Sequence, residues 1–321
     1  MGGIYWLASY PKSGNTWFRT FLANLLSGRD TPVDINDLSH TIASSRGWLD
    51  EVLGFDTAEL HPDEVDRLRP HVYRWSLRAP TPSYHKIHDA YYMVGGEPGA
   101  GAGGLVVAGA GGPAAPGEAA AAPEPLTSRE ATLGALYIIR NPLDVAPSYA
   151  DHRGTSIDDA IAAMNDPAHA LSRGTRGLPI QVRQRLGTWS QHVSSWVDAP
   201  GLRRLVIRYE DMQSDPMPTF TRAAQFLHAP EDPARIARAL DFSAFDTLAQ
   251  MERERGFRER SPRTGSFFRK GAAGDWRTTL TPAQVRAIID AHAPVMRRFG
   301  YLDARGEPVD QGAGSAAEPR P

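Results

Sequence analysis

The sequence contains no cysteine. This absence excludes disulfide bonds, thiolate metal ligands and a cysteine nucleophile. No apolar run approaches the ~20 residues that a membrane-spanning helix needs. The first residues also lack the basic stretch and long apolar stretch of a secretory signal. We therefore expect a cytoplasmic protein without a membrane span.

A strong excess of one charge is also missing. The 321 residues include 35 Lys and Arg against 37 Asp and Glu, which leaves a net charge of −2. Bulk electrostatics of this kind argue against nucleic acid as a partner. With 41% hydrophobic residues the chain can bury a sizeable core, and its length suits one large domain or two small ones.

Lysine is almost absent. Only Lys12, Lys86 and Lys270 occur among the 35 basic residues, and all the others are arginine. One interpretation is a codon bias that favours arginine throughout. The other is that these three sites require a compact ammonium group on a flexible stem, which a guanidinium cannot supply.

The segment "SYPKSGNTWF", residues 9–18, separates a short apolar run from an amphipathic one. Ile4 to Ala8 reads as a buried strand. From Trp17 to Leu26 apolar residues recur at helical spacing, and Gly28 follows as a stop. Such a strand–loop–helix unit offers unpaired N–H groups and a favourable helix dipole to an anion. The alternative is an ordinary turn in which Asn15 or Thr16 caps the helix.

The same segment is not a Walker A loop. That motif ends in Gly-Lys-Ser/Thr, whereas here Lys12 precedes Gly14. No candidate for the magnesium-binding Walker B carboxylate stands out. A phosphotransferase that uses ATP and Mg²⁺ is therefore the less favoured enzyme class.

Strands and helices alternate along the chain. Further strands are predicted around residues 83–92, 135–140 and 205–212, and helices are predicted to begin at Pro142, Pro233 and Pro282 and to include the apolar stripe from Val182 to Val197. Asn141 fits an N-cap with Asp144 as its capping-box partner. The pattern predicts an α/β fold of three layers, with a P-loop-like parallel sheet of about five strands and helices on both faces.

Composition divides the chain into a domain, an insertion and a tail. Residues 1–303 are predicted to form a single domain. Within it, residues 95–125 are dominated by Gly, Ala and Pro, which predicts a flexible insertion. Residues 304–321 have the composition of a disordered tail.

Four motifs resemble a known family. "YPKSGNTW" at 10–17 resembles the 5′-phosphosulfate loop of sulfotransferases that use 3′-phosphoadenosine 5′-phosphosulfate (PAPS), and "IIRNPLDVAPSY" at 138–149 resembles their 3′-phosphate motif. "YEDM" at 209–212 and "FFRKGAAGDWR" at 267–277 resemble two further elements, in family order. The first motif looks closest to bacterial members. The sequence therefore resembles the PAPS-dependent sulfotransferases.

The resemblance implies a sulfuryl transfer with a histidine base. Lys12 would meet the bridging oxygen, Lys86 the sulfuryl oxygens, and His88 would accept the proton of the acceptor hydroxyl. His88 lies two residues after Lys86, so both would point to the same side of a strand. A core or surface role for His88 is the alternative, and His85 is a nearby rival that alternation points away.

The resemblance also implies a set of cofactor-binding residues. Arg140 and Ser148 would hold the 3′-phosphate, while Trp17 and Phe245 would flank the adenine or belong to the core. The full set is Lys12, Ser13, Gly14, Asn15, Thr16, Trp17, Arg140, Ser148, Tyr209, Ser243, Phe245, Arg269, Lys270 and Gly271. The product would be 3′,5′-ADP, and no metal is implied.

Two positions depart from the family pattern. Pro147 lies before Ser148 inside a predicted helix, where it is expected to cost ~3 kcal/mol or to kink the helix. Arg277 stands where the family usually has lysine. The acceptor is expected to be a small hydroxylated metabolite, and a non-catalytic nucleotide-binding relative remains the alternative outside the enzymes.

Overall fold

The computed structural model describes residues 2–38, 41–95, 122–173, 179–261 and 264–310. Most of the predicted insertion at 95–125 and residues 311–321 of the predicted tail lie outside the described residues. The disorder predicted from residue 304 is wrong for residues 304–310, where the Val309 amide donates to the Tyr301 carbonyl oxygen at 3.0 Å. The chain forms two compact units. Unit 1 comprises residues 1–8, 41–137 and 167–204, and unit 2 comprises residues 9–40, 138–166 and 205–321.

A five-stranded sheet has the strand order β2-β3-β1-β6-β9. Its strands are β1 (Ile4–Ser9), β2 (Thr41–Ile42), β3 (Ser83–Ile87), β6 (Thr132–Ile139) and β9 (Arg204–Arg208). β3 runs parallel to both β1 and β2, and Leu7 pairs with Lys86 in the register of β1 and β3. Short apolar runs separated by helices produce such a sheet, because parallel strands need a crossover between them. The predicted α/β fold with about five strands is confirmed.

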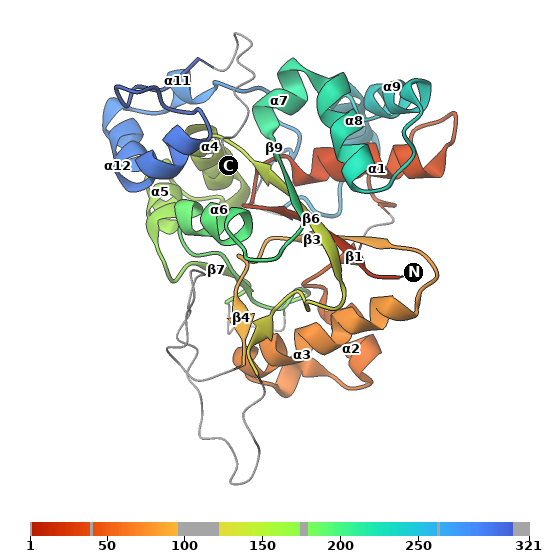
Figure 1. Ribbon diagram of the computed structural model, residues 1–321. Helices are drawn as coiled ribbons and strands as arrows, with labels where there is room; N and C mark the ends of the chain where they lie inside the picture. Colours follow the sequence, from red (N-terminus) through yellow and green to blue (C-terminus); the bar gives the residue numbers. More distant parts are fainter. Residues whose placement is uncertain (1, 39–40, 96–121, 174–178, 262–263, 311–321) are drawn as a thin grey trace. The chain divides into compact units, whose positions relative to one another are not determined.

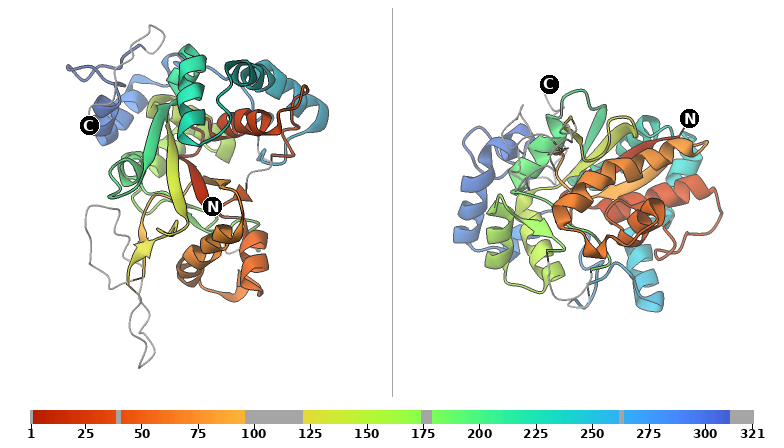
Figure 2. Two further views of the ribbon diagram at one scale, coloured as in Figure 1. Left: turned by 45° about the vertical axis from the view of Figure 1, so that its right-hand side comes forward. Right: turned by 90° about the horizontal axis from the view of Figure 1, so that it is seen from below.

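Unit 1 also contains helices and two short antiparallel strand pairs. These elements are α2 (Arg46–Leu53), η1 (Thr57–Glu59), α3 (Pro62–Arg74), η2 (Trp75–Arg78), α6 (Trp189–Val197), the antiparallel pair β4 (Met93–Val94) and β5 (Glu124–Pro125), and the antiparallel pair β7 (Ala170–Leu171) and β8 (Gln184–Arg185). α2 and α3 lie side by side (Figures 1 and 2).

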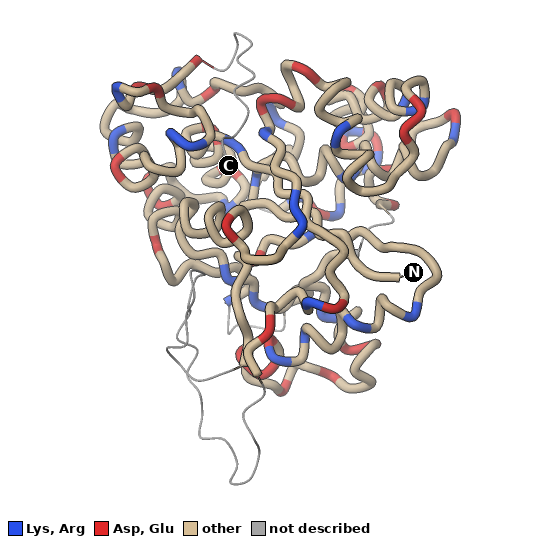
Figure 3. Tube along the Cα trace, in the orientation of Figure 1, with Lys and Arg blue, Asp and Glu red and all other residues tan. Residues whose placement is uncertain are grey.

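Unit 2 is mainly helical. Its helices are α1 (Asn15–Ser27), α4 (Pro142–Arg153), α5 (Ile157–Asn165), α7 (Tyr209–Ser214), α8 (Pro216–Phe226), α9 (Pro233–Phe242), α10 (Phe245–Arg255), α11 (Trp276–Thr279) and α12 (Pro282–Arg298). One group packs α9 against α1 and α8, and another packs α4, α5 and α12 together (Figure 1). In both units basic and acidic positions are interspersed along the trace (Figure 3).

The helix ends follow local sequence signals. α1 ends at Gly28, whose φ of 61° is the left-handed conformation that glycine adopts at little cost. Asn141 caps α4 by accepting a hydrogen bond from the Leu143 amide, and Thr281 begins α12 with a complete capping box. The predicted stop at Gly28, cap at Asn141 and helix start at Pro282 are confirmed. α4 passes through Pro147 and continues to Arg153, so the helix does not end at the proline.

The helix predicted from Val182 onward is shorter than its apolar stripe. Residues 179–188 are irregular apart from β8, and α6 begins only at Trp189. Thr188 provides a complete capping box with Gln191, which sets the start of the helix. Val182 and Leu186 are buried nonetheless. Their apolar spacing reflects burial rather than helical structure.

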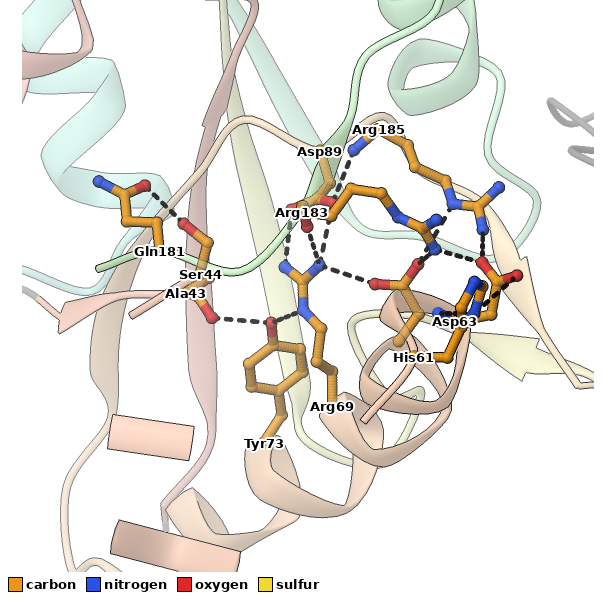
Figure 4. Close-up of polar contacts among 11 residues, drawn as sticks. Ala43, Ser44, His61, Asp63, Arg69, Tyr73, Asp89, Gln181, Arg183 and Arg185 are labelled. Atoms are coloured by element: carbon orange, nitrogen blue, oxygen red, sulfur yellow. Dashed lines mark hydrogen bonds and ion pairs between the residues drawn. The ribbon is translucent and has the colours of Figure 1, made fainter. Parts of the chain in front are cut away.

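Unit 1 contains a buried ion pair between Arg69 and Asp89. Arg69 on α3 donates to both carboxylate oxygens of Asp89, at 3.0 and 2.6 Å, and its Nε donates to the Tyr73 hydroxyl at 2.8 Å (Figure 4). The Tyr73 hydroxyl in turn donates to the carbonyl oxygen of Ala43. Neither side chain of the pair is exposed. Burial alone would lower the pKa of Arg69, but the Asp89 carboxylate raises it well above its usual value, so the guanidinium remains charged.

We expect Asp89→Asn to lower the free energy of unfolding by about 3–5 kcal/mol, because it leaves the Arg69 charge buried without its counter-charge. Urea unfolding followed by tryptophan fluorescence measures the loss. Replacing both partners, as Arg69→Met with Asp89→Leu, should recover much of it. A double variant no more stable than Asp89→Asn would contradict this account.

Candidate functional site

The loop between β1 and α1 has an unusual backbone. Lys12 and Gly14 both have positive φ, of 66° and 96°. Gly14 is the N-cap of α1, and no side chain caps this end of the helix. A Cβ atom at Gly14 would lie 2.6 Å from the Tyr209 ring, so only glycine fits. Asn15 and Thr16, the caps expected of an ordinary turn, are instead the first residues of the helix. The first amides of α1 are therefore available to an anion.

Three buried polar atoms near this loop have no hydrogen-bond partner among the described residues. They are the Ser13 hydroxyl, the Trp17 Nε1 and the Arg140 Nε. Ser13 is fully buried, and burying an unpartnered hydroxyl normally costs about 1–3 kcal/mol. These donors match what the oxygen atoms of a phosphate or sulfate require.

Arg140 joins distant stretches of unit 2. Its Nη1 donates to the carbonyl oxygen of Lys12 at 3.0 Å, and its Nη2 donates to that of Ala272 at 3.1 Å. The guanidinium carbon lies 4.2 Å from the centroid of the Tyr209 ring. Arg140 therefore contacts the loop after β1, the C-terminal loop and the start of α7. With five N–H groups it retains donors for a ligand.

Asp144 has a different role from the one predicted. Its carboxylate accepts hydrogen bonds from the backbone amides of Gly274 at 2.7 Å and Trp276 at 3.1 Å. It does not complete a capping box, because the Asn141 amide donates instead to the Glu210 carboxylate at 2.9 Å. Asp144 thus anchors the C-terminal loop to α4. Sequence reasoning missed this contact, whose only signal was the acidic residue in one motif and the glycines in the other.

The C-terminal loop from Ser266 to Asp275 is held by several contacts. Glu252, on α10, accepts from the amides of Phe267 and Phe268 at 2.7 and 2.9 Å. Gly271 has a φ of 59°, and a Cβ atom there would overlap the Phe245 ring. These contacts fix the backbone of the loop against α10.

The basic side chains of this loop share one acidic partner. Lys270 Nζ lies 2.5 Å from the Asp275 carboxylate, and Arg269 lies 3.5 Å from the same group. Both basic side chains are more than a third exposed. Both side chains thus remain partly exposed to solvent while they pair with Asp275.

Lys12 contacts an aromatic side chain of the same loop. Its Nζ lies 4.0 Å from the centroid of the Phe267 ring, which is a cation–π distance. The Phe267 ring packs edge-on against Phe257 at 4.9 Å. The ammonium group is therefore directed toward the C-terminal loop.

The remaining predicted cofactor residues lie in varied surroundings. Tyr209 is buried, burial raises its pKa, and its ring packs edge-on against Trp17 at 5.8 Å. Ser243 is fully buried, and its hydroxyl donates to the Ala239 carbonyl within the end of α9. That hydroxyl is used in the helix end. Ser148 is half-buried on α4.

Lys86 and His88 belong to unit 1, whereas the loop at Lys12 belongs to unit 2. Lys86 is in β3, and His88 follows its last residue. Burial alternates along this stretch: His85 and Ile87 are buried, while Lys86 and His88 are half-buried. The His85 ring packs against Trp48 at 4.7 Å, as a core residue does. The convergence of Lys86 and His88 on Lys12 stays a prediction.

Neither a metal-binding cluster nor a membrane-spanning helix occurs in the described parts of the chain. Within those ranges no group of three or more His, Asp or Glu residues is arranged to hold a metal ion. Among the helices that the structure describes, none has the length and apolar character to cross a membrane.

The curated proteins to which the chain is similar include several sulfotransferases. Cytosolic sulfotransferase 17 of Arabidopsis thaliana is 25% identical over 182 residues, which cover 53% of this chain and 51% of the relative. The chain spans about half the length of the curated relatives it matches.

Two solved structures are similar in fold. Mouse sulfotransferase SULT7A1 complexed with PAP has a TM-score of 0.53 at 20% identity, covering 92% of this chain and 84% of that chain. Retinol dehydratase in complex with androsterone and inactive cofactor PAP has a TM-score of 0.55 at 16% identity, covering 92% and 80%. At such identity the likeness shows the fold.

The chain also matches the model of a protein family. The model described as "Sulfotransferase domain" matches residues 123–300, which is more than half of the 321 residues. The matched region includes the Arg140 motif, Tyr209 and the C-terminal loop that Asp144 anchors. The chain belongs to the sulfotransferase domain family.

Proposed function

We propose that this protein transfers the sulfuryl group of PAPS to a hydroxyl group of an acceptor and releases 3′,5′-ADP. The observation that carries the proposal is the position of Arg140, which contacts the backbone of the Lys12 loop, Ala272 and the Tyr209 ring. These groups come from the four motifs that resemble PAPS-binding elements. The solved mouse sulfotransferase of similar fold contains PAP, in line with the same cofactor here.

The residues present fit a phosphosulfate. The uncapped end of α1, the buried Ser13 hydroxyl and the left-handed backbone at Lys12 and Gly14 bring several donors together in one loop. Successive backbone N–H groups in such conformations bind anions. Ser13, Gly14, Asn15 and Thr16 would hold the 5′-phosphosulfate in this way.

The other end of the nucleotide would meet the basic residues of unit 2. Arg140, through its unpartnered Nε, and Ser148 would bind the 3′-phosphate. Arg269, Lys270 and Gly271 would close over it, with the Asp275 carboxylate keeping the two basic side chains close together. Trp17, Tyr209, Ser243 and Phe245 are proposed around the adenine. The Ser243 hydroxyl and amide both donate within the end of α9, which leaves its carbonyl oxygen for such a contact.

The proposed reaction is an in-line displacement at sulfur. The acceptor oxygen forms the new O–S bond while the bond between sulfur and the bridging phosphate oxygen breaks. His88 takes the hydroxyl proton, and the electron pair of the broken bond stays on the phosphate of 3′,5′-ADP. Lys12 would stabilise the charge that develops on that oxygen, and Lys86 would contact the sulfuryl oxygens.

The acceptor is proposed to be a small hydroxylated metabolite, and the protein is proposed to be cytoplasmic. One structurally similar protein, retinol dehydratase, was solved in complex with androsterone. A curated relative is named a cytosolic sulfotransferase.

The choice of nucleotide tests the proposal directly. We expect 3′,5′-ADP to raise the melting temperature by several degrees at concentrations far above its Kd, because a ligand that binds only the folded state stabilises it. ATP with Mg²⁺ should give a smaller shift, because it lacks the 3′-phosphate. Differential scanning fluorimetry measures both. Stabilisation by ATP with Mg²⁺ alone would favour a phosphotransferase instead.

His88→Ala should lower the rate of transfer by about 10²–10⁴-fold, because the acceptor then loses its general base. Its affinity for 3′,5′-ADP should not change, since the proposed nucleotide contacts lie elsewhere. His71→Ala is the matched control, because His71 is exposed on α3. Turnover is measured with labelled PAPS and a panel of hydroxylated acceptors. Full activity in His88→Ala would show that another group is the base.

Gly271→Ala should weaken 3′,5′-ADP binding by about tenfold or more, because the new methyl group displaces either the loop or the Phe245 ring, an effect of 1.4 kcal/mol or above. Gly201→Ala is the control for backbone strain. Gly201 also has a positive φ, of 69°, but a Cβ atom there would contact nothing within 4 Å. Isothermal titration calorimetry measures both affinities. Equal binding by the two variants would remove Gly271 from the site.

A further inference from the structure

Two consecutive backbone carbonyls at the proposed base are both bound by side chains of α6. The Nε2 of His192 lies 2.9 Å from the His88 carbonyl oxygen, and the indole Nε1 of Trp196 donates to the Asp89 carbonyl oxygen at 2.9 Å. Residues four apart lie on the same face of a helix. One face of α6 therefore holds the two peptide groups that carry the base and the residue after it.

The protonation of His192 follows from its partners. A carbonyl oxygen can only accept, so Nε2 carries the hydrogen and donates it to His88. Nδ1 then accepts from the Tyr137 hydroxyl at 2.8 Å. Burial lowers the pKa of His192 to about 4, so the ring is neutral near pH 7. A neutral, fully buried imidazole with both nitrogens occupied is a rigid support.

Other contacts anchor the same segment from its flanks. The Asp89 carboxylate is bound by Arg69 of α3 and accepts from the Arg185 amide at 3.1 Å. The Tyr91 amide donates to the Ser195 hydroxyl of α6 at 2.9 Å. Backbone atoms and the neighbouring carboxylate take all of these bonds. None of them uses the imidazole of His88.

We propose that His192 is a positioning residue for the base: its Nε2–H fixes the His88 carbonyl and thereby sets the direction of the His88 side chain. Trp196 does the same at the next peptide group. The inference rests on the proposed function, in which His88 receives the acceptor proton. A base has to lie within hydrogen-bond distance of that proton, and a displacement of about 1 Å can cost about 10²-fold in rate.

Replacing His192 by Gln or by Asn distinguishes a positioning role from a packing role, because the two side chains place their amide groups at different distances from the backbone. In His192→Gln the side-chain amide reaches the place of Nε2 and can still donate to His88, whereas in His192→Asn it ends near the place of Nδ1 and cannot. We expect His192→Asn to lower kcat by about 10²-fold, with the KM for PAPS and the affinity for 3′,5′-ADP within about twofold of wild type. His192→Gln should recover at least about tenfold of that loss.

Active sites are counted in each sample by titration with 3′,5′-ADP, so that an unfolded fraction does not lower the measured kcat. Val193→Ala, which removes a buried side chain of α6, controls for loss of packing and should lower the melting temperature without lowering kcat per site. Trp196→Phe removes the second N–H donor and keeps an aromatic ring, and it should lower kcat per site independently of His192.

The outcomes distinguish this inference from the function on which it rests. Equal kcat values per site for His192→Asn and His192→Gln would overturn the positioning role while leaving the transfer activity standing. A drop in kcat per site in Val193→Ala as large as in His192→Asn would likewise assign the effect to packing. Absence of transfer by the wild-type protein, with PAPS and the full acceptor panel, would overturn the proposed function itself.

Discussion

The Arg140 guanidinium is the interaction on which the arrangement of unit 2 depends. It follows β6 and binds carbonyl oxygens of two loops that are far apart in the sequence, at Lys12 and Ala272. Carbonyl oxygens of irregular loops need donors, and a planar group with five N–H bonds can serve several at once. Asp144, four residues later in the same motif, complements it by accepting from the amides of Gly274 and Trp276. One short segment thus satisfies both kinds of backbone group in the C-terminal loop.

In unit 1, buried side chains hold the short segment that follows β3 through its backbone carbonyls and one carboxylate. The carbonyls of His88 and Asp89 are bound by α6, and the Asp89 carboxylate is bound by Arg69. Desolvating so many polar groups is unfavourable unless each has a partner, and here the partners are supplied by buried side chains. The arrangement gives the proposed base a defined backbone and a side chain that remains half-buried.

Sequence reasoning succeeded where the signal was local. The stop at Gly28, the cap at Asn141 and the helix start at Pro282 depend on residues within one turn of the helix end, and all three are confirmed. It failed where apolar residues at helical spacing are buried outside a helix. Val182 and Leu186 are buried outside any helix, so their spacing suggested a helix that begins only after Thr188. It also missed the contact of Asp144 with the distant C-terminal loop. The local hydrogen bond from the Ser243 hydroxyl to the Ala239 carbonyl oxygen was missed as well.

The sequence by itself determined the α/β class, the main strands and helix ends, and the four motifs that mark the family. Each of these follows from neighbouring residues or from a pattern of short period. Only the tertiary structure decided that Gly14 has to accommodate the Tyr209 ring, that Arg140 binds the Lys12 carbonyl, and that His192 and Trp196 bind the peptide groups at His88 and Asp89. These partners lie about 100 residues or more apart in the sequence, and which of them meet depends on the path of the whole chain.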